Sequence, residues 1–258
     1  MGDTKNKVPG WTTLYLNLYD VLGYVAPGFI LIAGLLIIGG RYGFCEYELR
    51  VAALEHLVNT LGLYTAAGGV VACYLAGNFL AALSKIPERL NWFGLDRVPE
   101  YLFVRPDYKG PYYKRGVTPE VLERFARAYY LVFLRDDAPD EAAPYLAFLR
   151  KLVGEERLRY KGILWDCYDY LLSREPAQHY AAYSFLSLQG FFRAVTAAGV
   201  ILTAFAFAVV DYGGFSGVDA TWLAVPVLIT LFSISRYVKF ARQFYYQTLR
   251  SFAVVVGE

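Results

Sequence analysis

The residue types that most often perform catalysis or bind metals are few and scattered in this chain. There are two histidines, His56 and His179, and three cysteines, Cys45, Cys73 and Cys167. The sequence contains neither the CxxC or HExxH spacing of a zinc site nor a phosphate-cradling GxxxxGK[ST] or GxGxxG loop. An odd cysteine count also argues against a disulfide scaffold. The sequence therefore predicts a protein that is not an enzyme, with no metal centre and no cofactor.

One pair of carboxylates has a spacing that suits chemistry. Asp166 and Asp169 are three residues apart, so a helix would place both on one face. Such a pair could hold a divalent ion. A solvated face, or ion pairs with Arg159 or Lys161, is the competing interpretation, and we favour it.

A basic stretch with interleaved aromatic residues is the main candidate for ligand binding. Basic side chains beside stacking rings suit a nucleotide or single-stranded nucleic acid, whereas the same composition after a membrane span suits anionic lipid headgroups. Both interpretations stay open. The candidate residues are Arg97, Arg105, Tyr108, Lys109, Tyr112, Lys114, Arg115, Arg124 and Arg127.

The composition of the whole chain indicates the class of protein to which these residues belong. Of the 258 residues, 57% are hydrophobic and only 19% are charged, against about 45–50% and about 25% in ordinary soluble domains. A net charge of +2 gives no strong signal for a polyanionic partner. Low hydrophobicity with high net charge, which marks disordered chains, is absent. The balance is that of a membrane protein.

The apolar excess lies in four stretches without a charged side chain. They are residues 21–40, 57–84, 194–210 and 220–235, with 20, 28, 17 and 16 residues. A bilayer core of about 30 Å needs about 20 helical residues, and aromatic ends with snorkelling arginines extend the two shorter runs. We therefore expect transmembrane helices at about 20–41, 57–84, 190–211 and 219–236.

The charged residues predict the topology. Residues 85–189 hold 16 basic and 15 acidic side chains, whereas the 211–219 loop has no Lys or Arg. The positive-inside rule places the middle segment and both termini in the cytoplasm. The expected fold is mainly α: a polytopic membrane protein with a helical cytoplasmic domain inserted between helices 2 and 3. Its parts are an N-terminal hairpin (1–84), the cytoplasmic domain (85–189), a C-terminal hairpin (190–236) and a helical tail (237–258).

Turn and cap residues divide the middle segment. Four prolines between residues 85 and 116 predict irregular structure there, with one short strand at 101–104. Helices are expected at 118–135, 140–153 and 155–173, capped at their starts by residues such as Thr118 and Asp140. From Pro176 no break precedes the third span. The fourth span is expected to continue inward to about residue 252.

Small residues recur every fourth position in the second span. This ridge allows another helix to approach closely, either the first span or a second protomer. Asn78 is the one strongly polar side chain of the inner half, and an amide in hydrocarbon needs a partner or water. A bond to a neighbouring helix and a place in a pore are the alternatives. The candidate packing or pore residues are Thr65, Gly69, Cys73, Gly77, Asn78 and Ala81.

Several segments together resemble a loosely defined class of bacterial four-span membrane proteins of antiphage defence. They are LYDVLGYVAPGF before span one, CYLAGNFLAALSKIPER after span two, YAAYSFLSLQGFFRA before span three and SRYVKFARQFYYQTLRSF after span four. The chain looks like the channel-like effector of the Hailong system, which works beside a nucleotidyltransferase. Such proteins often carry a histidine after the glycine of span two, where this chain has Asn78.

The resemblance implies a homo-oligomeric effector that a nucleotide or short oligonucleotide controls through the cytoplasmic domain. We accordingly expect a gated ion channel or pore, with four copies favoured, whose opening depolarises the membrane and arrests growth. Its partners would be the bilayer, further copies of itself, the nucleotide-type ligand and a soluble protein such as a nucleotidyltransferase. The alternative is a non-conducting membrane anchor or sensor that recruits a soluble defence partner.

Overall fold

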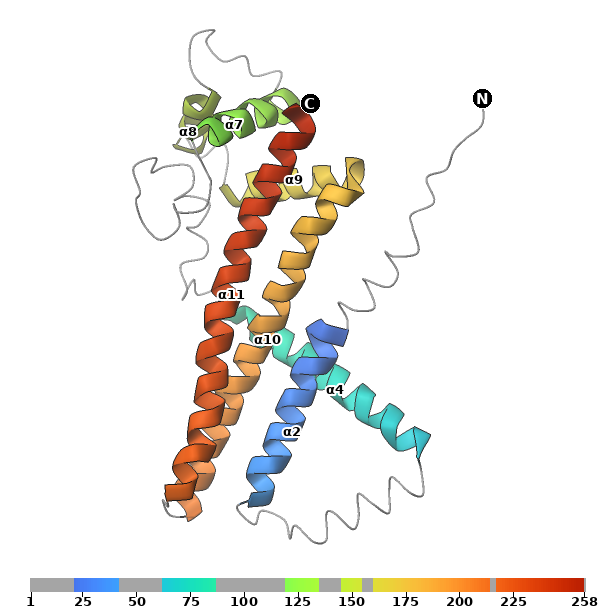
Figure 1. The fold of residues 1–258 in the computed structure, drawn as a ribbon, viewed down its shortest axis with the longest axis vertical. Helices are drawn as coiled ribbons and strands as arrows, with labels where there is room; N and C mark the ends of the chain where they lie inside the picture. Colours follow the sequence, from blue (N-terminus) through green and yellow to red (C-terminus); the bar gives the residue numbers. More distant parts are fainter. Residues whose placement is uncertain are drawn as a thin grey trace. The chain divides into compact units, whose positions relative to one another are not determined.

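The computed structural model describes residues 21–41, 62–86, 119–134, 145–154, 160–213 and 217–257. Every regular element in these ranges is a helix, which confirms the mainly α class (Figure 1). The elements are η1 (Val21–Val25), α2 (Ala26–Arg41), α4 (Leu63–Leu83), α7 (Pro119–Phe133), α8 (Tyr145–Gly154), α9 (Tyr160–Arg174), α10 (Pro176–Gly213) and α11 (Gly217–Gly257).

Four of these helices are long and apolar enough to cross a membrane, as the sequence predicted. The candidate spans are Gly23–Gly40, Ala66–Leu83, Gln178–Val209 and Leu223–Val256. The last two belong to α10 and α11, which have 38 and 41 residues. At 1.5 Å per residue these helices are about 57 and 62 Å long, roughly twice the thickness of a bilayer core. Part of each must therefore lie outside the hydrocarbon of any membrane that it crosses.

The expected starts and ends of the helices compare closely with the structure where both can be seen. Helix α7 begins at Pro119, directly after the predicted cap Thr118, and α10 begins at Pro176 without a break before the third span. Helices α8 and α9 are described from Tyr145 and Tyr160. The predicted cap Asp140 and the predicted strand at 101–104 lie outside the described residues.

The chain divides into two compact units, each built from separate parts of the sequence. Unit 1 consists of Met1–Arg89 and Ser187–Tyr237, and unit 2 of Leu90–Leu186 and Val238–Glu258. Helices α10 and α11 contribute residues to both. The charge-poor sequence runs fall in unit 1, and the segment of ordinary soluble composition falls in unit 2.

The core of unit 1 joins the candidate spans. Its fully or nearly buried residues are Leu31 and Ile38 of α2, Leu80 of α4, and Ala194, Ala198, Leu202 and Ala206 of α10, with Leu223 of α11 packed against them. Residues of α10 enter this core at every fourth position, and three of the four are alanines. Small side chains at these positions allow neighbouring helices to approach closely.

Helices α2 and α4 approach at two glycines whose neighbours are backbone atoms. A β-carbon on Gly28 would run into the carbonyl group of Cys73, and one on Gly77 would run into the carbonyl group of Tyr24. Tyr24 belongs to η1, the π-helical turn that precedes Pro27. Because proline has no N–H, the regular hydrogen-bond ladder is interrupted at this point. The turn and the glycines together form a close crossing of the two helices.

Helices α10 and α11 also meet at a glycine in unit 1. A β-carbon on Gly199 would lie against Thr230, 3.2 Å from its Cα. The Thr230 hydroxyl donates to the carbonyl oxygen of Pro226 at 2.8 Å, so this polar group bonds within its own helix. The rings of Phe192 and Phe232 pack edge to face with centroids 6.2 Å apart.

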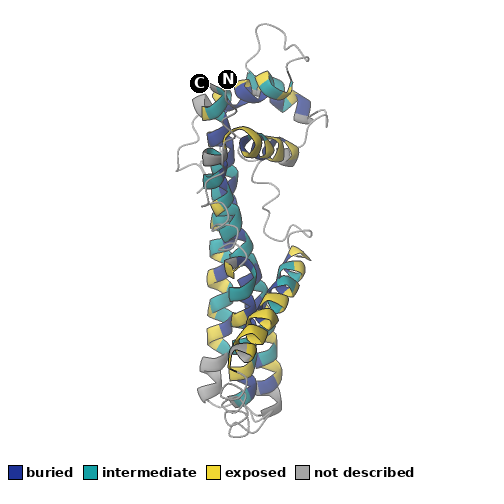
Figure 2. Ribbon diagram, turned by 90° about the vertical axis from the view of Figure 1, so that its right-hand side faces the viewer, coloured by how far each residue is buried: buried dark blue, intermediate teal, exposed yellow. Residues whose placement is uncertain are grey.

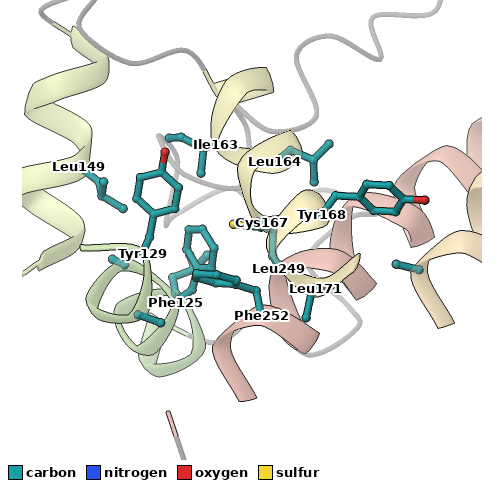
Figure 3. Packing of buried hydrophobic residues seen from close by; sticks show 14 of the residues in the cluster. Phe125, Tyr129, Leu149, Ile163, Leu164, Cys167, Tyr168, Leu171, Leu249 and Phe252 are labelled. Atoms are coloured by element: carbon teal, nitrogen blue, oxygen red, sulfur yellow. The ribbon is translucent and has the colours of Figure 1, made fainter. Parts of the chain in front are cut away.

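Unit 2 has an aromatic core, shown in Figure 3. Phe125 and Tyr129 of α7, Cys167 and Leu171 of α9 and Phe252 of α11 are all nearly or fully buried. The Phe252 ring packs against four other rings, with centroids 5.3 to 6.5 Å away. The C-terminal part of α11 is thus built into the core that α7 and α9 form.

Among the described residues, large exposed apolar side chains concentrate on the candidate spans, and α4 carries more of them than any other helix. Figure 2 shows exposed residues along much of this helix. Tyr64 is 80% exposed, and Val70, Val71, Leu75 and Phe79 are each more than half exposed. A water-soluble surface rarely carries so many large apolar side chains together. The exposure is compatible with a lipid-facing helix.

Candidate functional site

The predicted ligand-binding residues lie mostly outside the described residues. This applies to Arg97, Arg105, Tyr108, Lys109, Tyr112, Lys114 and Arg115. The two that the structure places, Arg124 and Arg127, lie on α7 of unit 2 and both are exposed. They are three residues apart, so their side chains leave the same face of the helix. This is the face opposite Phe125 and Tyr129, which are buried in the core.

The packing around α8 adds a detail that sequence reasoning missed. The Glu123 carboxylate accepts a hydrogen bond from the backbone N–H of Tyr145 at 2.7 Å. Tyr145 is the first residue of α8, whose initial N–H groups have no partner within the helix. An acidic group is also favoured there by the helix dipole. Glu123 on α7 therefore caps α8, a role invisible to local sequence patterns because the two residues are 22 positions apart.

The ridge of small residues on α4 is divided between two environments. Cys73 and Gly77 are buried at the crossing with η1 and α2. Gly69 has open space where a β-carbon would stand, and Ala81 is half-buried. Thr65 lies in the first turn of α4. The inner half of the ridge thus packs against the first span of the same chain, whereas Gly69 does not.

Asn78 forms a hydrogen bond within its own helix, and its place in a pore stays a prediction. Its side-chain amide donates to the carbonyl oxygen of Tyr74 in the same helix at 2.9 Å. A carbonyl four residues earlier is within reach of a polar side chain on a helix. The amide group is thereby partly satisfied without a neighbouring helix.

The two carboxylates of α9 are used separately and not as a pair. Asp166 accepts a hydrogen bond from the Tyr129 hydroxyl at 2.7 Å, whereas Asp169 acts electrostatically on His179. No cluster of three or more His, Cys, Asp or Glu side chains with metal-ligand geometry occurs among the residues that the structure places. The arrangement gives no support to a divalent cation at this pair.

Burial and the hydrogen bond to Asp166 change the pKa of the Tyr129 hydroxyl. Tyr129 is 1% exposed. Burial, followed by the hydrogen bond and charge of Asp166, raises the pKa of Tyr129 far above its usual value. Burial likewise raises the pKa of the Cys167 thiol well above its usual value, which makes this cysteine an unreactive core residue. Both groups stay protonated and neutral at physiological pH.

His179 is a buried polar residue that packs against the aromatic residues of unit 2. It lies in the first turn of α10, 9% exposed, and its Nε2 atom is buried with no hydrogen-bond partner in the described structure. Its ring centroid is 4.6 Å from that of Tyr168 and 5.9 Å from that of Tyr183. A lone histidine in a sequence gives no sign of such an environment.

We expect Tyr129→Phe to lower the free energy of unfolding of unit 2 by about 1 kcal/mol, the net value of one hydrogen bond to a partly solvated carboxylate. Asp166→Ala should cost more, about 2 kcal/mol, because it leaves a buried hydroxyl without its acceptor. Hydrogen exchange of the α7 amides in the detergent-solubilised protein measures both. The matched control is Tyr130→Phe on the same helix, which should change little. Equal effects of the Tyr129 and Tyr130 variants would contradict a stabilising bond.

Comparison with known proteins adds no assignment. No protein-family model matches the chain, and neither curated proteins nor solved structures give a significant match. The fold therefore defines the class of this protein in structural terms only. It is a helical protein with four helices long and apolar enough to span a membrane.

Proposed function

We propose that this chain is an effector of bacterial antiphage defence that forms a gated pore in the inner membrane. Several copies, with four favoured, assemble around the conducting path. Residues 85–189 and the tail 237–258 lie in the cytoplasm with both termini, as the distribution of basic residues favours. A nucleotide or short oligonucleotide acts on the cytoplasmic part, and opening depolarises the membrane and arrests growth.

The observation that carries this proposal is the continuity of α10 and α11. Each is a single helix that is long enough to cross the bilayer and extend well beyond it. Each contributes one end to the apolar unit 1 and the other to unit 2. Ligand binding in a cytoplasmic unit needs a mechanical connection to the membrane, and two continuous helices supply one.

The composition of the candidate spans favours a passive pore over an ion-coupled transporter. The charge-free runs of the sequence cover the centres of the four transmembrane helices expected at about 20–41, 57–84, 190–211 and 219–236. Coupled transporters generally need ionisable groups at that depth. Four helices of one chain enclose little space, so conduction requires several copies. The exposed apolar surface of α4 supplies area for such contacts.

Arg124 and Arg127 support an anionic ligand on unit 2. Both are exposed on one face of α7, within reach of phosphate groups in solution. Guanidinium groups bind phosphate through paired hydrogen bonds. A soluble nucleotidyltransferase encoded with this protein would be a natural source of the ligand. A nucleotide-type product would account for the basic residues between Arg97 and Arg127, the last two of which lie on α7.

The test combines a bacterial host with purified protein. Induced expression under a membrane-potential dye should depolarise the cells, and purified protein in liposomes should release a trapped ion when ribonucleoside triphosphates or a short oligoadenylate are added. Arg124→Glu with Arg127→Glu should abolish the response to these probes while leaving the oligomer intact. Lys151→Glu, an exposed charge on α8, is the matched control and should respond normally. Unchanged potential and no ion release with any probe would refute the pore.

The non-conducting anchor has one observation in its favour. The Asn78 amide bonds to its own helix, and the large side chains around it are apolar, so this face of α4 carries no evident hydrophilic lining. An anchor would retain a soluble partner at the membrane without ion release. Recovery of that partner with the membrane fraction, together with intact liposomes, would support this function instead.

A further inference from the structure

His179 stands where two helices of unit 2 meet. Helix α9 ends at Arg174 and α10 begins at Pro176, so Glu175 is the single residue between them. The His179 backbone N–H donates to the Glu175 carbonyl oxygen at 3.0 Å. The imidazole ring is held on the α9 side by Tyr168. The ring therefore fills the angle between the two helices.

Described residues of α9, α10 and α11 lie around this ring. From α9 come the Tyr168 ring and the exposed carboxylate of Asp169, which is the charged group that acts on the imidazole. From α10 comes Tyr183, and Glu175, the residue between the two helices, is exposed. Helix α11 contributes neutral groups to this neighbourhood. They are Phe244, packed on Tyr168 at 5.5 Å, and Ser251, whose hydroxyl donates to the Gln178 side chain at 3.4 Å.

These contacts favour a neutral imidazole. A protonated ring carries donors on both nitrogens, yet Nε2 is buried without an acceptor. Burial also removes the water that would solvate the charge. Asp169 opposes these effects only in part, because its carboxylate lies at the surface. Adding a proton therefore requires that the ring leave its place between α9 and α10.

We propose that His179 makes the packing of α9 against the start of α10 sensitive to acid, so that acidification of the cytoplasm loosens unit 2 at the point where α10 begins. The inference rests on the proposed placement of residues 176–186 on the cytoplasmic side. In that setting protons entering through an open pore would act on the helix that continues into the membrane. The proposal deepens the gating mechanism by naming a second input besides the ligand.

The direction of the effect follows from proton binding. When α9 separates locally from the start of α10, His179 becomes exposed and binds a proton with a pKa of about 6.5. We call this the open state of the packing. The packed state disfavours that proton. Because the open state binds more protons, the packing is fully stable above about pH 6.5 and loses stability as the pH falls below that value. One proton limits the change to about tenfold in the opening equilibrium per pH unit.

Hydrogen exchange of the full-length protein in lipid nanodiscs tests the proposal. After correction for the intrinsic pH dependence of exchange, protection of the amides in 160–186 should fall by up to about fivefold between about pH 6.5 and 5.5. His179→Phe fills the same space with a ring that cannot titrate, and its protection should not change over this interval. Identical pH profiles of the wild type and this variant would overturn the proposal, as would a flat wild-type profile.

A second variant decides the matter if His179→Phe does not fold. Asp169→Asn removes the one carboxylate that favours the protonated ring, from an exposed site where the fold should tolerate the change. Protection at about pH 5.5 should then fall further than in the wild type. An unchanged profile would refute the role of His179. Since exchange is measured without ion flow, a protein that conducts nothing can still pass this test.

Discussion

Replacing Gly77 with alanine should open the crossing between α4 and the first span. The new β-carbon would occupy the position of the Tyr24 carbonyl group, and neither helix backbone can move aside cheaply. Overpacking of this kind costs about 1–3 kcal/mol. The buried thiol of Cys73, one turn away on the same helix face, reports the opening. We expect an uncharged maleimide to label Cys73 in the detergent-solubilised protein about five to a hundred times faster than in the wild type.

Gly69→Ala is the matched control for this experiment. It makes the same chemical change in the same helix, but its β-carbon meets open space. The labelling rate of Cys73 should stay within about twofold of the wild type, since alanine is the better helix former. Cys45 is replaced by serine, and the fully buried Cys167 should stay unlabelled in every variant, which reports that unit 2 remains folded. If Gly77→Ala and Gly69→Ala label at the same rate, the close crossing of α4 with η1 and α2 is wrong.

Truncating Phe252 to alanine should have the largest effect on unit 2. This ring is 0% exposed and packs against Phe125, Phe133 and Tyr170, besides Tyr129. Removing a fully buried aromatic side chain costs about 3–5 kcal/mol through lost burial and the cavity that remains. The amides of α7 and α9 should lose protection from hydrogen exchange by at least about a hundredfold, whereas those of α2 and α4 should keep it.

Val254→Ala supplies the comparison two residues along the same helix. Its side chain is 45% exposed, and its truncation should cost less than about 1 kcal/mol. A Phe252 variant that unfolds no more readily than the Val254 variant would show that the end of α11 does not belong to the unit 2 core. Loss of protection in α2 and α4 as well would mean that the two units unfold together.

Elements that depend on local composition could be predicted from the sequence. The four charge-free runs predicted helices that could span a membrane, because hydrocarbon thickness and helix rise fix the length that is needed. The unbroken helix from Pro176 and the continuation of the last helix beyond the fourth charge-free run also follow from local signals, namely a proline at the first helical position and the absence of later breaks. Helix α7 began where Thr118 and Pro119 predicted.

The partners of individual side chains could not be predicted in this way. The sequence placed Asp166 and Asp169 on one helix face. In the structure Asp166 accepts a hydrogen bond from Tyr129, 37 residues away, whereas the charge of Asp169 acts on the pKa of His179. Helix periodicity defines which residues share a face and says nothing about the element that the face meets. The same limit applies to Glu123 as the cap of α8.

The amino-acid sequence by itself determined that this protein is helical and that four of its helices can span a membrane, because helix formation and bilayer-length hydrophobicity are properties of neighbouring residues. Only the tertiary structure decided which glycines of the α4 ridge lie against the backbone of another helix. It also decided that the His179 ring packs against Tyr168 and Tyr183. Those outcomes depend on contacts between segments far apart in the chain. Close packing and burial act through space, and no local pattern encodes them.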